Sequence, residues 1–246
     1  MLEFSVRTHR GRVREKNQDC YYVPSGSGIN VFAVADGMGG HAAGEVASSL
    51  CIQALNENIV EHGSNLMQFD RSQMKQFLQN AVLDGNDRIL SAQKENAEFD
   101  GMGTTITAAV FMVQEILVGH VGDSQAHLFN KDGHYQITED HSLVMELLKN
   151  GEIQPDEIRS HPQRHMLTRA LGTSPQLIVD FYFTPFNKDD YLLLCTDGLT
   201  SMLQVETIQE IVLGQERSLG NKVDQLIHRA NATGGLDNIT VVLVRA

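Results

Sequence analysis

Apolar residues along the chain form two kinds of run, and each kind predicts a different element. Short runs that are continuous or alternate with polar residues, bounded by turn residues, are typical of strands. We predict about ten strands, near residues 2–8, 19–23, 30–36, 104–113, 115–122, 125–130, 134–138, 177–184, 190–195 and 238–245. Residues 114–115 and 131–133 are very short links between such runs. These links predict antiparallel hairpins, because a parallel pair needs a long crossover.

Helical spacing of apolar residues occurs in four further segments. Residues 42–61 and 70–94 lie between the third and fourth strands, and two shorter segments lie near 204–213 and 221–231. Each has a single apolar stripe, so each is expected to cover one face of a sheet. Ten mostly antiparallel strands are more than a single sheet usually contains. We therefore predict an α+β fold, a four-layer α-β-β-α sandwich of two mostly antiparallel sheets flanked by helices.

The length and composition fit a single globular domain. The chain has 246 residues, of which 41% are hydrophobic and 20% charged, and only five are proline. No stretch resembles a linker and no repeat of fixed period occurs, so we predict one domain over residues 1–246. The net charge of −12 argues against a nucleic-acid binder and against docking on an anionic membrane.

Neither a membrane span nor a secretory signal is expected. No segment reaches the roughly 18 consecutive apolar residues of a span, and residues 1–14 alternate apolar and charged positions. The three cysteines, Cys20, Cys51 and Cys195, are too few and too scattered for a disulfide framework or a zinc site. We expect the protein to be cytoplasmic, with no membrane insertion.

Aspartates recur at the ends of the apolar runs. Runs end just before Asp36, Asp123 and Asp197, while Asp19 and Asp237 stand at the start of a strand. A single Asp-Gly pair is most simply a turn. Several carboxylates that converge need a counter-charge, because unpaired buried carboxylates are costly. Few arginines and lysines are adjacent in the sequence, and divalent cations would supply that charge.

Carboxylates without histidine or cysteine partners indicate a hard metal ion. Oxygen ligands favour Mg²⁺ or Mn²⁺, and no zinc-type spacing is present. Gly37, directly after Asp36, allows a backbone carbonyl to approach the same ion. Two ions about 3.5–4 Å apart that share carboxylates would form a binuclear hydrolytic centre with a bridging water as nucleophile. Such a centre suits phosphate-ester hydrolysis.

Two further residues suggest roles in phosphate chemistry, each with a plainer alternative. Arg14, near Asp19, would hold non-bridging phosphate oxygens with its guanidinium, or is simply a surface arginine. His41 follows a glycine-rich turn. It either protonates the leaving alkoxide or only caps or packs at the start of a helix.

Eight segments, taken together, carry a family resemblance. They are residues 14–19, 34–45, 102–105, 119–124, 138–142, 167–172, 195–199 and 237–240. In this order they resemble the motifs of the metal-dependent type 2C serine/threonine protein phosphatases (the PPM family), in the compact bacterial form. Any one motif is weak, whereas eight at matching spacing over the whole chain are highly specific. The resemblance implies a β-sandwich flanked by helices, in agreement with the predicted elements.

The resemblance also implies a set of metal ligands. Asp36, Asp197 and Asp237, with the Gly37 carbonyl, would hold two tightly bound Mn²⁺ or Mg²⁺ ions. Asp123 together with Asp197 would hold a third, weaker ion.

Further roles follow from the same resemblance. Arg14 would bind the phosphate, with Asp19 and Asn238 in support, and His41 would act in catalysis. Residues 141–164 would form a flap beside the site that touches the protein substrate. The implied substrates are phosphoserine and phosphothreonine proteins, and a bacterial serine/threonine kinase is the expected counterpart. We expect a monomer.

Rival readings of the motifs are less consistent with the sequence. Residues 37–42 fit G-x-G-x-x-A, but no second strand with an acidic end follows about 20 residues later. The P-loop motif does not match, because Glu45 stands where the motif requires lysine. A cysteine phosphatase needs arginine six residues after the nucleophile, where Gly26, Glu57 and Ser201 stand.

The remaining alternative is a phosphoprotein-binding pseudophosphatase that keeps the fold without turnover. The loss of a metal aspartate would mark it, and all four are present.

Overall fold

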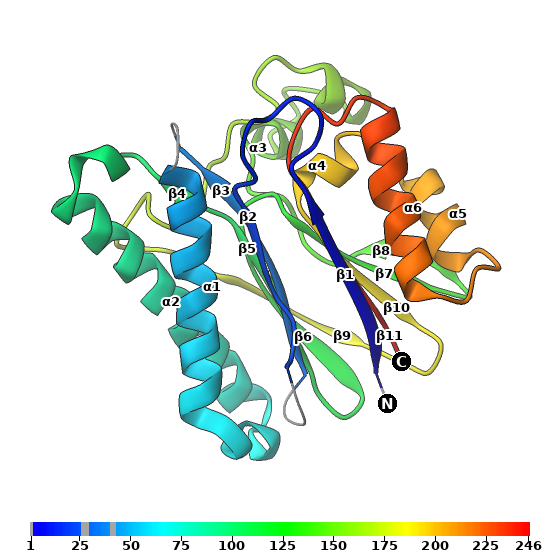
Figure 1. Cartoon of the computed structure of the whole chain (residues 1–246), viewed down its shortest axis with the longest axis horizontal. Coiled ribbons are helices and arrows are strands. Elements are labelled where there is room, and N and C mark those ends of the chain that lie inside the picture. The colour runs from blue at the N-terminus through cyan, green and yellow to red at the C-terminus, as the bar shows by residue number, and fades with distance from the viewer. Residues whose placement is uncertain (1, 26–29, 40–42) are drawn as a thin grey trace.

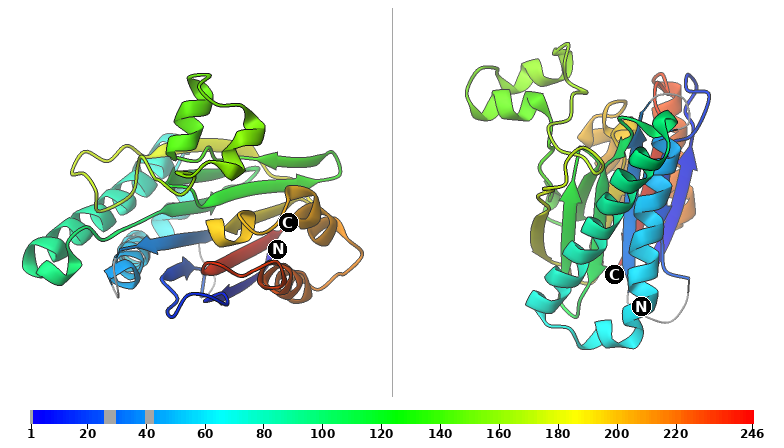
Figure 2. Two further views of the ribbon diagram at one scale, coloured as in Figure 1. Left: turned by 90° about the horizontal axis from the view of Figure 1, so that it is seen from above. Right: turned by 90° about the vertical axis from the view of Figure 1, so that its left-hand side faces the viewer.

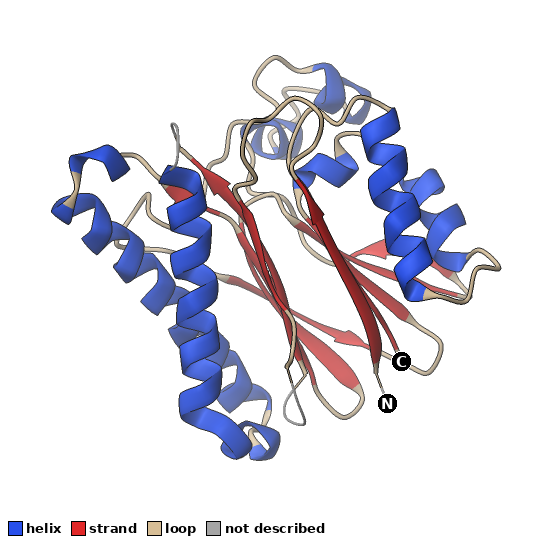
Figure 3. Ribbon diagram, in the orientation of Figure 1, coloured by secondary structure: helices blue, strands red, loops and turns tan. Residues whose placement is uncertain are grey.

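The structure is a computed structural model that describes residues 2–25, 30–39 and 43–246. Two β-sheets face each other, and helices cover the outer face of each (Figures 1 and 3). Every strand pair is antiparallel. The predicted α+β sandwich of four layers is therefore confirmed.

The first sheet has the strand order β1-β11-β10-β7-β8. Its strands are β1 (Glu3–His9), β7 (Gln125–Asn130), β8 (Gly133–Gln136), β10 (Tyr191–Cys195) and β11 (Ile239–Arg245). Two helices cover it, α5 (Val205–Leu213) and α6 (Leu219–Ala232). The first and last strands of the chain lie side by side in this sheet.

The second sheet has the order β2-β3-β5-β6-β9, with β4 beside β3. Its strands are β2 (Asp19–Tyr22), β3 (Val31–Met38), β4 (Gly103–Thr104), β5 (Ile106–Phe111), β6 (Glu115–Val121) and β9 (Asp180–Pro185). The helices α1 (Ala43–His62) and α2 (Arg71–Glu95) cover it, and the short 3₁₀ helices η1 (Gly63–Gln68) and η2 (Ala97–Phe99) follow them. Both short links produce the predicted hairpins, β5–β6 and β7–β8.

The central strands are buried on both faces, which explains their continuous apolar runs. In β3, Val31 and Ala33 pack toward α1 and α2, whereas Phe32 and Val34 pack against the first sheet. Phe32 is fully buried and meets Phe111 edge-to-face, with ring centroids 5.4 Å apart. The inter-sheet layer fixes the spacing of the two sheets, and hence that of any groups at their ends.

Three differences from the predicted elements have local causes. The strand predicted over 104–113 is broken at Thr105, whose backbone N–H donates to the Asp36 carbonyl and whose hydroxyl accepts from the Asp36 N–H. The strand predicted from 177 begins at Asp180. The element α4 (Asp197–Thr200) was not predicted, because four residues are too few to show helical spacing.

The segment predicted as a flap holds α3 (Leu143–Lys149) and the 3₁₀ helix η3 (Pro155–Ser160). These elements stand out from the sandwich above one end of the sheets (Figure 2). Their base is closed by a β-bridge between Ser142 and Leu167. In the described part of the chain, no helix is both long and apolar enough to cross a bilayer.

Candidate active site

A cavity of about 600 Å³ collects the predicted site residues at one end of the sandwich. Its walls include Arg14 and four aspartates that are distant in the sequence: Asp36, Asp123, Asp197 and Asp237. Asp36 comes from the end of β3 in the second sheet, whereas Asp197 and Asp237 flank β10 and β11 in the first. The fold therefore brings these four strand-end aspartates together at one cavity.

Two glycines directly follow aspartates of the cavity, at positions where other backbone segments come very close. A Cβ on Gly37 would lie 2.1 Å from the carbonyl oxygen of Gly44, at the start of α1. A Cβ on Gly198 would lie 1.8 Å from the carbonyl oxygen of Asn238. Both distances are far inside van der Waals contact, so only glycine fits. These contacts pack α1 against β3, and α4 against β11, directly beside Asp36 and Asp197.

Asp19 lies beneath the cavity rather than in its wall. It sits opposite Asp36 in the β2–β3 register and is buried. Its Oδ2 accepts hydrogen bonds from the hydroxyls of Thr196, at 2.9 Å, and Thr240, at 2.7 Å. Its Oδ1 is buried without a hydrogen-bond partner. Asp19 thus ties the two sheets together below the site.

Asn238 also lies outside the cavity walls, and its contacts hold the loop that carries Arg14. Its amide nitrogen donates to the carbonyls of Arg10, at 3.0 Å, and Lys16, at 2.8 Å. Its amide oxygen accepts from the Gln18 N–H at 2.8 Å. Asn238 therefore positions the 10–18 loop.

Burial and mutual repulsion favour the protonated form of several carboxyls. Burial, and then Asp19 and Asp197, raise the pKa of Asp36 well above its usual value. Burial and then Asp197 do the same to the pKa of Asp123. Burial raises the pKa of Asp19 to about 7, against the opposing effect of its two threonine hydrogen bonds. The cluster is therefore unstable as a set of free anions.

These observations fit divalent cations better than any protein counter-charge. Two buried carboxylate oxygens, Asp19 Oδ1 and Asp197 Oδ1, have no hydrogen-bond partner. Asp197 Oδ1 lies at the wall of this acidic cavity and Asp19 Oδ1 beneath it, and carboxylate oxygens without a partner are the donors that Mg²⁺ and Mn²⁺ take. Among the described residues, no three acidic, histidine or cysteine side chains enclose one point by themselves. An ion here would use one or two carboxylates and complete its shell with water or a carbonyl.

Arg14 reaches across the cavity to an aspartate. Its Nη2 donates to Asp237 Oδ2 at 2.7 Å, and about half of the Arg14 side chain is exposed. This hydrogen bond is the main cause that raises the pKa of the guanidinium. Arg14 therefore faces the aspartate cluster from a loop braced by Asn238.

The structure adds a brace that we did not predict from the sequence. His141 Nδ1 accepts from the Gly122 N–H at 3.0 Å, so its proton is on Nε2, which donates to Asp180 at 3.0 Å. Arg169 in turn donates to both oxygens of Asp180. His141 and Arg169 belong to motifs quoted above, but Asp180 carries no sequence signal. The brace ties the Gly122–Asp123 turn to the edge strand β9.

The end of the flap approaches the site from one side, since Arg164 and the next residue, His165, both line the cavity. His165 Nδ1 lies 3.8 Å from Asp197 Oδ2. Arg159 reaches toward the carbonyls of Thr200 and Leu203, and Lys149 forms an ion pair with Glu139. Arg159 and Lys149, two of the flap's charged residues, therefore contact this chain itself.

His41 lies outside the described residues, so its role stays a prediction. The cysteines are all free thiols, and burial raises the pKa of both Cys51 and Cys195. Reactive thiolates are therefore not favoured at these two positions, in keeping with the exclusion of a cysteine phosphatase.

Comparison with known proteins matches the chain to the family described as Protein phosphatase 2C, over residues 7–234. The chain is 40% identical to the serine/threonine phosphatase stp of Listeria innocua over 244 residues, which cover 99% of this chain and 95% of that protein. The Stp1 structure from Staphylococcus aureus superposes with a TM-score of 0.92 at 34% identity, covering 100% and 95% of the two chains.

A third relative was solved with metal. The catalytic domain of the serine/threonine protein phosphatase PstP, in complex with two manganese ions, superposes with a TM-score of 0.84 at 34% identity. The alignment covers 99% of this chain and 97% of that chain.

Proposed function

The chain belongs to the protein phosphatase 2C family, and we propose that it hydrolyses phosphoserine and phosphothreonine in proteins at a binuclear Mn²⁺ or Mg²⁺ centre. One observation carries this proposal: four aspartates from both sheets line one cavity together with Arg14. A relative that binds two manganese ions supports the metal requirement.

Each side chain has a distinct task in this proposal. Asp36, Asp197 and Asp237, with the Gly37 carbonyl, hold the two tightly bound ions, and Asp123 with Asp197 holds a weaker third one. When bound, the ions supply a metal-activated water and offset the negative charge of the phosphate. Arg14 grips phosphate oxygens through its guanidinium fork. His165 and the 141–164 flap border the protein substrate.

Turnover of p-nitrophenyl phosphate with and without metal tests the proposal. The purified chain should be active with added Mn²⁺ or Mg²⁺ and inactive in excess chelator. Asp36→Ala and Asp197→Ala should each lose most of kcat, because each would remove a carboxylate that holds the ions. Full activity in chelator would contradict the metal-dependent mechanism. Phosphopeptide binding without turnover in any metal would instead favour the pseudophosphatase.

The third ion has its own test. An ion with few protein ligands keeps most of its waters and binds weakly. Asp123→Ala should therefore retain two tightly bound ions by calorimetry but lose much of its turnover at limiting metal. An Asp123→Ala enzyme with wild-type turnover would remove the third ion from the mechanism.

The wider setting is proposed on the same basis. We propose a monomer that works in the cytoplasm and opposes a serine/threonine kinase. Phosphoproteomics of cells with and without this protein would identify the substrates, and sedimentation would give the oligomeric state. If the flap selects substrates, flap substitutions should change the ranking of phosphothreonine peptides more than the rate on an aryl phosphate.

A further inference from the structure

A second cavity, of about 370 Å³, adjoins the catalytic cavity on the side of the flap. The two cavities share Asp123 and Asp197 as lining residues, and the second one adds Asp140. Asp140 lies between the end of β8 and the start of α3, where the first sheet meets the flap. It therefore borders the same space as the two aspartates proposed to hold the third ion.

Side-chain amides hold the Asp140 carboxyl group in place. Gln125 Nε2 donates to both of its oxygens, Oδ1 at 3.0 Å and Oδ2 at 2.8 Å, and Gln136 Nε2 donates to Oδ1 at 3.1 Å. Among the residues that the structure describes, no arginine, lysine or histidine forms an ion pair with Asp140. A carboxylate here carries a charge that the protein itself does not balance.

Two neutral histidines extend these hydrogen bonds toward the surface. Gln125 Oε1 can only accept, so His127 Nε2 donates to it at 2.9 Å, and His127 Nδ1 accepts from His134 Nε2 at 2.8 Å. Burial lowers the pKa of both rings, that of His127 to about 3, so neither ring is charged at neutral pH. Every donor in this row points toward Asp140, and none of them brings a positive charge.

The neighbouring aspartates make a charge on Asp140 less favourable still. Burial is the main cause that raises the pKa of Asp140 to about 7, and the Asp197 charge adds to it, against the hydrogen bonds from the two glutamines. Burial, Asp197 and then Asp140 raise the pKa of Asp123. Three carboxyl groups therefore repel one another around one space, and a cation in that space would relieve the repulsion.

Asp140 does not complete a set of direct ligands. Within residues 2–25, 30–39 and 43–246, no three acidic, histidine or cysteine side chains surround one point closely enough to hold a metal ion. An ion on Asp123 and Asp197 would therefore keep waters in its shell. A carboxylate across the same cavity is a natural acceptor for hydrogen bonds from such waters.

We propose that Asp140 is a positioning residue for the third ion, and that its carboxylate accepts hydrogen bonds from the waters of that ion. This inference rests on the proposed function, because it presupposes that Asp123 and Asp197 hold the ion. Gln125 and Gln136 fix the direction of the carboxylate, and its unbalanced charge attracts the cation. The two tightly bound ions do not depend on it.

Mn²⁺ titrations of the full chain, followed by calorimetry at a pH above the Asp140 pKa of about 7, would test the proposal. The wild type should bind two ions tightly and a third one weakly. Asp140→Asn keeps the shape of the side chain but removes its charge, and should weaken the third ion alone by about tenfold. The Mn²⁺ concentration that gives half-maximal turnover of an aryl phosphate should rise by a similar factor.

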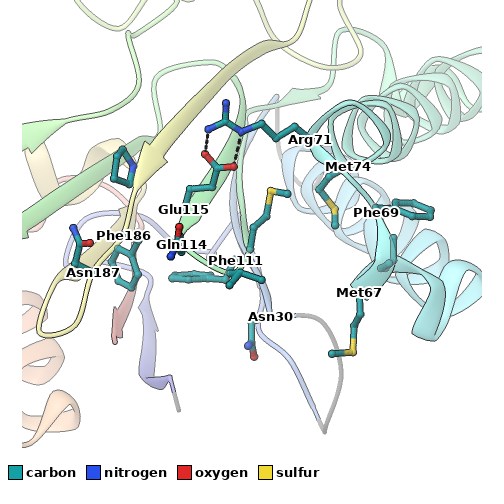
Figure 4. A pocket seen from close by; sticks show the side chains of 14 residues that line it. Asn30, Met67, Phe69, Arg71, Met74, Phe111, Gln114, Glu115, Phe186 and Asn187 are labelled. Carbon is teal, nitrogen blue, oxygen red and sulfur yellow. Dashed lines mark hydrogen bonds and ion pairs between the residues drawn. The ribbon is translucent and has the colours of Figure 1, made fainter.

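Two variants control for the loss of one negative charge. Glu139→Gln removes it one residue away, from a side chain that pairs with Lys149. Glu115→Gln removes it at the far end of β6, where Glu115 pairs with Arg71 (Figure 4). That end lies roughly 20 Å from the turn before Asp123, at ~3.3 Å per residue of the strand. Both variants should bind all three ions like the wild type.

Two further measurements separate this role from a purely structural one. Asp140→Asn should not lower the Tm of the metal-free protein in chelator, because it removes a carboxylate that has no cation partner. In an Asp123→Ala background, Asp140→Asn should cause no further loss of Mn²⁺ affinity, since both residues act on the same ion.

Three results would overturn the inference. A third ion that binds the wild type and Asp140→Asn equally would show that Asp140 does not position it, and would leave the proposed function standing. Equal weakening by Asp140→Asn and Glu139→Gln would reduce the effect to one of general charge. A wild-type chain that binds only two ions would remove the third ion and this inference together, while its turnover with Mn²⁺ would still test the phosphatase activity separately.

Discussion

At the scale of single residues, Asp19 couples proton binding to folding. Its pKa is raised from 3.8 to about 7 in the folded chain, so the native state binds its proton more tightly than the unfolded state does. That contribution to stability is full at pH values below about 4 and is lost as the pH rises to about 7. Burial raises the pKa of Asp140 to about 7 as well, which acts in the same direction.

We therefore expect the metal-free protein to lose stability as the pH rises from about 4 to about 7. Urea unfolding in chelator at several pH values would measure it. Asp19→Asn should show a shallower decline, because the amide does not titrate. Equal pH dependence of the variant and the wild type would contradict the role given to Asp19.

Arg14 allows a separate test of phosphate binding. We expect Arg14→Ala to raise KM for a phosphopeptide by about tenfold, the loss of one charge-assisted contact. Arg14→Lys should be intermediate, since lysine keeps the charge without the fork. Mn²⁺ affinity should not fall in either variant, because the guanidinium only competes for Asp237. Calorimetry that showed lost metal binding in Arg14→Ala would contradict this division of roles.

At the scale of elements, two substitutions at His141 can test its two hydrogen bonds separately. Asparagine at 141 could still accept from the Gly122 N–H, while glutamine could reach Asp180 but not Gly122. Loss of an outer partner typically weakens metal affinity by about 10–100-fold. We expect His141→Gln to weaken binding of the third Mn²⁺ ion, the one that Asp123 would hold, by roughly tenfold and His141→Asn by less. Equal effects of the two substitutions would mean that the Gly122 contact does not position Asp123.

Lys222 joins α5 to α6 and is fully buried. Its Nζ donates to the carbonyls of Ile211, Val212 and Gly214, at 2.8–3.1 Å, and so satisfies the C-terminal end of α5. We expect Lys222→Met to destabilise the protein by about 2–4 kcal/mol, because it leaves buried carbonyls without donors. Urea unfolding would measure this, with exposed Lys188→Met as the control. Turnover per folded molecule should be unchanged.

The elements also show where sequence reasoning succeeds. Strand ends were predictable because the apolar runs are long and bounded, and the aspartates at those ends were found with them. The ion-pair partner of Arg14 could not be predicted, since Asp237 is 223 residues away in the sequence. Asp180 and Lys222 act through neighbours that only the tertiary fold supplies. Thr105 interrupts a strand by bonding to Asp36, and no periodicity reveals such a contact.

At the scale of the whole molecule, the aspartate cavity joins both sheets. We propose that residues 1–246 unfold as one cooperative unit, because Asp36 belongs to one sheet and Asp197 and Asp237 to the other. Each tenfold increase in Mn²⁺ above its Kd adds ~1.4 kcal/mol and should raise Tm by roughly 3–6 °C. Calorimetric scans across a Mn²⁺ series would measure this. Two transitions, only one of them metal-dependent, would contradict the single unit.

The pairing of β1 with β11 has a consequence for how the molecule is made. β1 leaves the ribosome long before its partner in the sheet, β11, is translated. Asp237 and Asn238 emerge together with β11. A nascent chain can therefore assemble the second sheet with α1 and α2 while β1 still lacks its partner strand β11. Activity should appear only after β11 has been translated, so a ribosome stalled before β11 would hold an inactive enzyme.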